Sequence, residues 1–238
     1  MVYVKNLKKG FGDHQVLKGL NLEIEKGETM VIMGRSGCGK SILLKIIMRL
    51  LEPDEGEIWV DGKEVTELTE KEMDKVRKRF GMVFQSAALF DSLTVGENVG
   101  FSLPRHTDMS RDQIAQVVAE KLEMVGLKGI ENTMPVDLSG GMKKRVSLAR
   151  AIAMDPEIVL YDEPTTGLDP ITAGEIDKLI VGLHNRLRVT SIVVTHDMRS
   201  AFAIATRMAM LYEGKIVTVG TPEEFRESAE PVVRGFLI

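Results

Sequence analysis

Gly34-Arg35-Ser36-Gly37-Cys38-Gly39-Lys40-Ser41 is the stretch that decides the fold of this 238-residue chain. It matches the pattern G-x-x-x-x-G-K-[ST], in which the backbone N–H groups of a glycine-rich loop surround a polyphosphate. The apolar run 29–33 before it predicts a buried strand, and the run 42–48 after it predicts a helix. A strand, a glycine loop and a helix are the context that this motif requires. The stretch therefore predicts a phosphate-binding loop rather than a glycine-rich turn with a chance lysine.

The residue types in this loop predict how it binds its ligand. Its three glycines let consecutive N–H groups turn inward, and the helix that follows adds the partial positive charge of its N-terminus. Lys40 is expected to reach the β- and γ-phosphates, and the hydroxyl of Ser41 is expected to bind Mg²⁺. The residues predicted to bind the nucleotide here are Gly34, Arg35, Ser36, Gly37, Cys38, Gly39, Lys40, Ser41 and Ile42.

The composition is that of an ordinary globular protein, with 44% hydrophobic and 28% charged residues. No apolar run approaches the roughly 18–20 residues of a membrane-spanning helix, and the N-terminus lacks the features of a secretory signal. The one cysteine, Cys38, cannot form an internal disulfide, which suits a reducing cytosol. A net charge of −4 gives no general attraction for nucleic acid, so none is expected as a partner. The basic clusters 75–79 and 143–145 are expected to be solvated helix faces.

Strand and helix patterns alternate along most of the chain and predict an α/β fold with a mainly parallel sheet covered by helices on both faces. Leu20, Leu22 and Ile24 alternate with polar residues, which predicts a half-buried strand of a small antiparallel β subdomain. We expect a single domain over 1–238, in which 1–85 and 156–238 form the nucleotide-binding core with that β subdomain. Residues 86–155 are expected to form a helical insertion. Helix starts are predicted by capping sequences at Thr69, Ser110, Asp169 and Thr221.

Several polar residues follow predicted strands, and the carboxyl ends of parallel strands border the ligand crevice of an α/β sheet. Asp162 comes after four apolar residues and suits a Mg²⁺ ligand, whereas Glu163 suits general-base work on the water that attacks the γ-phosphate. Gln85 is expected to touch Mg²⁺ or this water through its amide, and His196 is expected to face the γ-phosphate. Strand ends are usually polar, so the prediction depends on all four residues occurring together with the phosphate loop.

Leu138-Ser139-Gly140-Gly141-Met142 resembles the signature sequence of ABC-type ATPases, and further motifs in the same order extend this resemblance to nearly the whole chain. Gly167-Leu168-Asp169 is similar to the D-loop of that family, His196 to its switch histidine and Gln85 to its Q-loop. Phe11 is similar to the aromatic residue that stacks on adenine. The resemblance implies ATP and Mg²⁺ as cofactors and ATP hydrolysis coupled to transport.

The resemblance also implies the partners of the chain. In the family, two subunits associate head to tail, and each lends its signature segment to the ATP of the other. Ser139, Gly140, Gly141 and Asp169 are thereby expected to contact nucleotide across a two-fold symmetric dimer. A separate membrane permease is the second implied partner, which would hold the chain on the cytoplasmic face of the inner (plasma) membrane.

A closer resemblance, carried by the stretch from Phe84 to Val95, is to the ATPase subunits of Mla/Mce-type lipid transporters. It implies phospholipid transport between membranes and a lipid-binding Mce-type protein reached through the permease. Three departures from the family pattern stand out. Ile42 occupies a position where most members carry threonine, Met142 replaces glutamine, and the sequence ends at Ile238 without the C-terminal tail of many lipid-transport ATPases.

Other functions remain open from the sequence. An importer of amino acids or another polar solute is the alternative cargo class, because cargo touches the permease and not this subunit. Soluble ABC proteins that act on ribosomes or nucleic acid usually carry two cassettes or a long coiled coil, and this chain shows neither. A nucleotide-gated switch without turnover is disfavoured by Glu163. The apolar residues Leu89 and Phe90 are expected either in the core of the helical insertion or in a surface groove for a short helix of the permease.

Overall fold

The computed structural model describes residues 1–237, and the chain divides into two compact units. The first unit contains Met1–Arg77 and Thr190–Ile238, and the second contains Lys78–Val189. The functional division expected from the sequence, with a helical insertion at 86–155, stays a prediction. The second compact unit is larger than this insertion, because it also includes the paired strands at 80–83 and 158–162.

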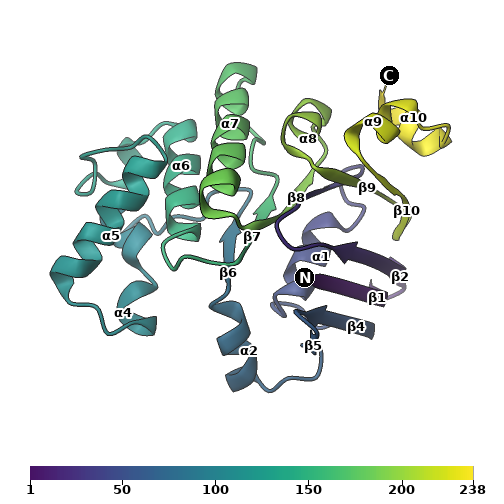
Figure 1. Ribbon diagram of the computed structural model, residues 1–238, viewed down its shortest axis with the longest axis horizontal. Helices are drawn as coiled ribbons and strands as arrows, with labels where there is room; N and C mark the ends of the chain where they lie inside the picture. Colours follow the sequence, from purple (N-terminus) through teal and green to yellow (C-terminus); the bar gives the residue numbers. More distant parts are fainter. Residues whose placement is uncertain (238) are drawn as a thin grey trace. The chain divides into compact units, whose positions relative to one another are not determined.

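The first unit begins with a four-stranded antiparallel sheet in the order β2-β1-β4-β5. Figure 1 shows β2, β1 and β4 side by side. The alternation of Leu20, Leu22 and Ile24 places all three side chains in the core, as the sequence predicts. Asp61 (φ 49°) and Gly62 (φ 75°) make the left-handed turn of its short hairpin. The strands are β1 (Val2–Phe11), β2 (His14–Ile24), β4 (Glu55–Val60) and β5 (Lys63–Glu64).

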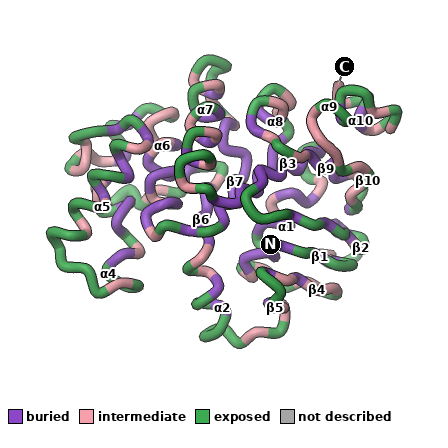
Figure 2. Tube along the Cα trace, in the orientation of Figure 1, coloured by how far each residue is buried: buried purple, intermediate pink, exposed green. Residues whose placement is uncertain are grey.

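A second sheet in this unit carries the phosphate loop. Strand β3 (Thr29–Met33) pairs in parallel with β8 (Thr190–Thr195) and β9 (Arg207–Tyr212), and β10 (Lys215–Gly220) pairs antiparallel to β9. Every residue of β3 and β8 is buried, as expected for strands covered on both faces (Figure 2). The helices of the unit are α1 (Lys40–Ile47), α2 (Glu70–Arg77), α8 (Met198–Ile204), α9 (Pro222–Glu227) and α10 (Pro231–Leu237).

The second unit combines a parallel strand pair with most of the long helices. Strands β6 (Phe80–Val83) and β7 (Ile158–Asp162) pair in parallel and are completely buried. Helix α6 packs on β6 and also contacts α3, α5 and α7. The helical elements are α3 (Val95–Gly100), α4 (Leu103–His106), α5 (Arg111–Met124), the 3₁₀ turn η1 (Pro135–Asp137), α6 (Gly140–Ala151) and α7 (Pro170–Leu187).

The predicted capping sequences begin helices, because in each case a side chain satisfies N–H groups that have no partner within the helix. Ser110 caps α5 and Thr221 caps α9, each in a complete capping box. Asp169 accepts from Ile171 N and Thr172 N at the start of α7. Within residues 1–237, none of the helices combines the length and apolar character that crossing a membrane requires.

The expectation that the two basic clusters are solvated is wrong for Lys144, which is only 5% exposed. Arg77 is half-buried: it donates to the backbone oxygens of Met48 (3.1 Å) and Arg49 (3.0 Å) and also pairs with the exposed Glu70 and Asp74. The side chains of Arg77 and Lys144 thus donate to backbone carbonyls that would otherwise lack these bonds.

Candidate functional site

The phosphate loop joins β3 to α1, and its conformation requires glycine at two positions. Gly37 (φ 81°) and Gly39 (φ 106°) adopt left-handed backbone conformations. A Cβ atom on Gly39 would also lie 2.8 Å from Cγ1 of Val16, and one on Gly34 would lie 2.5 Å from the backbone oxygen of Leu211. The packing of β2 and β9 on the loop therefore excludes larger residues. Gly39 is the N-cap of α1, so the loop ends at a helix N-terminus.

Lys40 lies beneath the loop and holds its shape. The residue is only 6% exposed, and its Nζ donates to the backbone oxygens of Gly34 (2.8 Å) and Arg35 (3.2 Å). The ammonium is thus fixed against two carbonyl groups at the start of the glycine loop. Ser41, the predicted Mg²⁺ ligand, and Ile42 are half-buried in the first turn of α1.

A cavity of about 290 Å³ adjoins the loop within the first unit. Arg35, Ser36, Gly37 and Cys38 form one wall, and the turn at Glu213 and Gly214 forms another. The rest of the lining comes from two strands: His14, Gln15, Val16 and Lys18 of β2, and Leu211 and Tyr212 of β9.

Phe11 ends the strand β1 and is 49% exposed. The Lys9 ammonium lies 5.6 Å from the centre of the Phe11 ring and forms an ion pair with Asp54 (2.7 Å). A half-exposed aromatic ring of this kind has the apolar face that stacking on a nucleobase needs.

His196 follows the last residue of β8 and is exposed. Its position is fixed on the C-terminal side by Asp197, whose carboxylate caps α8 by accepting from Arg199 N (2.8 Å). Asp197 N donates in turn to the Thr195 hydroxyl (3.0 Å), which closes a tight turn around the histidine. The imidazole therefore projects from a rigid strand-to-helix junction rather than from a long loop.

In the second unit, the two predicted acidic residues occupy the end of β7. Asp162 and Glu163 are 6% and 7% exposed. Glu163 has a left-handed backbone (φ 49°), which is uncommon outside glycine and asparagine and recurs at functional sites. The Thr166 hydroxyl donates to its carboxylate (3.2 Å), and Thr166 N donates to its backbone oxygen (3.3 Å).

Gln85 follows β6 and is exposed, and the chain beyond it makes an unusual turn. Ala87 and Ala88 both have positive φ angles, of 63° and 48°. The guanidinium of Arg150 donates to the backbone oxygens of both residues, at 2.7 and 2.6 Å. Burial lowers the pKa of Arg150. Helix α6 thus holds this turn in place.

Lys144 is a residue that the sequence analysis missed. Its Nζ lies 2.5 Å from the backbone oxygen of Gln85 and 3.4 Å from that of Glu163. Burial lowers its pKa, while the Asp162 and Glu163 carboxylates act in the opposite direction. The spacing of Lys144, Leu148 and Ala151, all buried on α6, is the helical signal that indicates its burial.

The predicted signature segment begins α6. Ser139 is the N-cap and accepts from Met142 N (3.3 Å), and both Ser139 and Gly140 are exposed. A Cβ atom on Gly141 would lie 2.7 Å from Cγ2 of Thr172, so glycine lets α6 approach α7 closely. The helix N-terminus and the two glycines give this surface exposed N–H groups that can bind an anion.

Asp169 begins α7 next to this segment. Hydrogen bonds from the Thr172 hydroxyl (2.6 Å) and from the backbone N–H groups of Thr172 and Ile171 lower its pKa. The second unit therefore contains Gln85, Ser139, Gly140, Gly141, Asp162, Glu163 and Asp169, and the first contains Phe11, the phosphate loop and His196. Among residues 1–237, no group of three or more His, Cys, Asp or Glu side chains forms a metal cluster.

Comparison with known proteins gives one family. The family model described as "ABC transporter" matches residues 17–166. The chain is 44% identical over 237 residues to the intermembrane phospholipid transport system ATP-binding protein MlaF of Haemophilus influenzae, covering 100% of this chain and 90% of that protein. It is 42% identical over 241 residues to the methionine import ATP-binding protein MetN of Carboxydothermus hydrogenoformans, covering 100% and 71%. The dimeric ATP-binding cassette MJ0796 bound to ADP and phosphate aligns with a TM-score of 0.85 at 37% identity, over 93% of this chain and 99% of that one.

Proposed function

The chain belongs to the ABC transporter family, and from this premise we propose that it energises a separate membrane permease that moves phospholipid between membranes. The chain is an ABC ATPase and the ATP-binding subunit of its transporter. The observation that carries the lipid assignment is the 44% identity with a phospholipid-transport ATPase over 237 residues. Fold alone does not choose a cargo, because cassettes of one fold serve many transporters.

In this proposal the phosphate loop binds the triphosphate of ATP. Its N–H groups and the Lys40 ammonium neutralise the β- and γ-phosphates, and the half-exposed ring of Phe11 stacks on adenine. The fixed hydrogen bonds of Lys40 to Gly34 and Arg35 support this role, because the cation and the loop are organised before the ligand arrives.

Ser41, Gln85 and Asp162 supply a hydroxyl, an amide oxygen and a carboxylate, which are the hard oxygen donors that Mg²⁺ prefers. These residue types fit the ion, and we propose that they hold it. When bound, Mg²⁺ neutralises phosphate charge during phosphoryl transfer.

Glu163 is the proposed general base. It accepts a proton from the attacking water, whose oxygen bonds the γ-phosphorus while the bond to the β-γ bridging oxygen breaks and ADP leaves. Its buried position at the end of β7 and its left-handed backbone support the role, because such backbone conformations recur at functional sites. His196 is proposed to hold the γ-phosphate, and the Gln85 amide to orient the water.

The exposed start of α6 supports the proposed head-to-tail dimer. Ser139, Gly140 and Gly141 would bind the ATP of the partner copy, and Asp169 would lie at the same interface. The solved cassette with a TM-score of 0.85 is itself a dimer bound to ADP and phosphate. Two ATP molecules would then be enclosed between two copies of this chain.

An exposed aromatic pair supports the contact with the permease. Phe90 and Phe101 are 44% and 42% exposed, and their ring centres lie 4.5 Å apart. Of the two positions expected for Phe90, the surface one is thus favoured. The buried Asn98 fixes this loop by accepting from Phe90 N (2.8 Å) and donating to the backbone oxygens of Phe90, Leu93 and Thr94.

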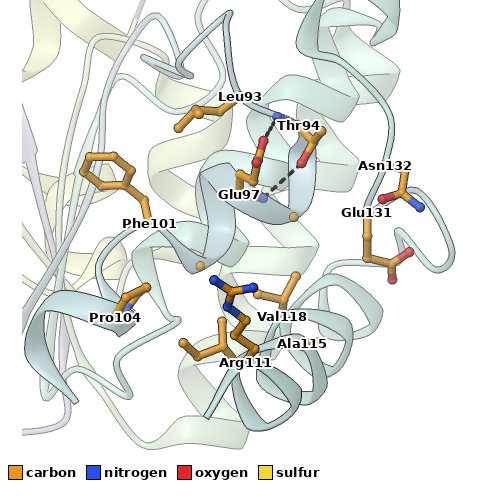
Figure 3. Close-up of a pocket in the computed structure, with 13 residues that line it drawn as sticks. Leu93, Thr94, Glu97, Phe101, Pro104, Arg111, Ala115, Val118, Glu131 and Asn132 are labelled. Carbon is orange, nitrogen blue, oxygen red and sulfur yellow. Dashed lines mark hydrogen bonds between the residues drawn. The ribbon is translucent and has the colours of Figure 1, made fainter. Parts of the chain in front are cut away.

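A mainly apolar pocket of about 500 Å³ extends from Phe101 between α3 and α5 (Figure 3). Figure 3 shows Leu93, Phe101, Pro104 and Val118 around it, with the Thr94–Glu97 capping box along one side. Together with the aromatic pair, this pocket suits the apolar side chains of a short permease helix. The permease would hold the chain at the cytoplasmic face of the inner membrane, and an Mce-type lipid-binding protein would act through the permease.

The experiment that tests this function uses the whole complex. An affinity-tagged chain is purified with its permease from host membranes, reconstituted in vesicles containing fluorescent phospholipid, and supplied with ATP and Mg²⁺. We expect ATP-dependent lipid movement that is lost with Glu163→Gln. ATP-dependent methionine uptake without lipid movement would instead support the importer alternative. Methionine is the solute to test because the chain is 42% identical to a methionine-import ATPase.

A further inference from the structure

Lys144 is a buried lysine that the functions assigned above do not use. Its residue is 5% exposed, and Nζ donates to the backbone oxygens of Gln85 (2.5 Å) and Glu163 (3.4 Å). These two acceptors belong to loops that follow neighbouring parallel strands, β6 and β7. One ammonium group therefore connects the segment that presents the glutamine amide with the segment that presents the glutamate carboxylate.

The two loops need such support because their backbones are irregular. Glu163, Ala87 and Ala88 are all left-handed, with φ between 48° and 63°. Residues other than glycine keep this conformation only where surrounding contacts hold it. Arg150 bonds the oxygens of Ala87 and Ala88, and Lys144 bonds those of Gln85 and Glu163. Both cations come from α6, the helix that begins with the signature segment.

The chemistry of lysine suits this task. An ammonium has three donors and no acceptor, so it can bond two carbonyl oxygens at once, and its four-carbon stem reaches them from the helix. A buried cation is also costly without partners, so its presence on the inner face of α6 indicates that the hydrogen bonds to both loops form. The Asp162 and Glu163 carboxylates lie near enough to interact with its charge.

We propose that Lys144 is a positioning residue for ATP hydrolysis, because it fixes the spacing between the loop of Gln85 and the loop of Glu163. This inference rests on the proposed function, in which the amide and the carboxylate act on the same water. Lys144 touches neither ATP nor water in this proposal and acts only through the two backbones. Through α6 it also connects both loops to the surface that faces the nucleotide of the partner copy.

The test replaces Lys144 by methionine, which keeps most of the stem and removes the donors. In Lys144→Met we expect kcat to fall about 10- to 100-fold, the loss that follows from small misplacement of reacting groups, while KM for ATP stays within about threefold. Lys144→Arg retains a cationic donor and should recover part of kcat. In a Gln85→Ala background, Lys144→Met should cost less than in the wild type, because part of its effect passes through that amide.

Lys121→Met is the matched control. Lys121 is a buried lysine of the same unit, 4% exposed, and its Nζ bonds Asp155 (2.5 Å) rather than either loop. It should lower the melting temperature without lowering kcat. Wild-type kcat in folded Lys144→Met, or an equal loss in both variants, overturns the inference. If Lys144→Met does not fold, Lys144→Leu, which also lacks donors, is judged by the same criteria. Absence of ATP hydrolysis by the wild type would contradict the proposed function itself.

Discussion

Individual side chains of the phosphate loop make contacts that hold its shape or line the adjoining cavity. Lys40 donates to two loop carbonyls, and Cys38 is half-buried in the wall of the adjoining cavity. In the second unit, Glu163 combines low exposure with a left-handed backbone. We expect substitutions at such residues to change chemistry or access more than global stability, and two predictions follow for single residues of the first unit.

Nucleotide is expected to protect Cys38 from thiol reagents. Because Cys38 is the one cysteine in the chain and lies between Gly37 and Gly39, its labelling reports on the loop alone. Saturating ATP should slow modification at least about fivefold, since bound phosphate occupies the loop. Mass spectrometry of timed samples measures the rate. Cys38→Ser should bind ATP and resist inactivation by the reagent, and equal labelling with and without ATP would refute the prediction.

His196→Ala should lower kcat by at least about tenfold with a smaller change in the Kd for ATP. The histidine stands at a rigid strand-to-helix junction and is proposed to contact the γ-phosphate, whereas most binding energy comes from the loop. Steady-state kinetics and equilibrium titration with ATP separate the two effects. A variant that binds ATP poorly but hydrolyses normally at saturation would exclude this role.

At the scale of elements, side chains of α6 hold the segment that runs from Gln85 to α3. Helix α6 bonds the segment through Lys144 and Arg150, and Asn98 of α3 bonds its far end at Phe90. The segment contains little regular secondary structure, but hydrogen bonds hold both of its ends. If the permease displaces the exposed aromatic pair, we therefore expect Gln85 to move as well. Such a movement would couple the conformation of the permease to the nucleotide state.

Phe90→Asp should leave folding and ATP binding intact and abolish co-purification with the permease. Phe90 is 44% exposed, so the new carboxylate remains solvated and the cost of burying a charge does not arise. Pull-down from detergent-solubilised membranes and a thermal melt measure the two effects. Leu50→Asp, at a residue that is 53% exposed in the first unit, is the control and should retain the permease. A soluble Phe90→Asp protein that still binds its permease would rule out this contact.

At the scale of the whole molecule, the proposed dimer needs two surfaces from each copy of the chain. In this proposal the phosphate loop of one copy and the signature segment of the other bind the same ATP. ATP would then link the two copies, and its hydrolysis would release them. The assembly state should depend on turnover as well as on nucleotide concentration.

Glu163→Gln should bind ATP, lose turnover by about 10²- to 10⁴-fold and accumulate as an ATP-bound dimer, because glutamine does not accept the proton of water. Size-exclusion chromatography with ATP and Mg²⁺ follows the dimer, and phosphate release follows turnover. Glu223→Gln makes the same chemical change at an exposed residue of α9 and should behave as the wild type. Near wild-type turnover in Glu163→Gln would remove Glu163 from its role.

The sequence by itself determined the α/β fold class and the membership of the ABC family, through motifs that occur in a fixed order. Phosphate loops, capping boxes and buried strands are local patterns, so a few adjacent residues suffice to specify them. The ABC fold is confirmed by the solved cassettes, which align over most of the chain. The roles of Gln85, Glu163 and His196 stay predictions, because they depend on where a nucleotide binds.

Only the tertiary structure revealed which groups the internal polar residues bond. Lys144 belongs to a basic cluster that reads as a solvated face, yet it is buried because α6 packs on β6 and presents it to two carbonyls. The surface position of Phe90 and the left-handed Glu163 were equally hidden in the sequence. Each is set by partners 8 to 59 residues away in the chain, such as Asn98 for Phe90 and Gln85 for Lys144. Contacts between distant segments are fixed by packing, which local patterns do not encode.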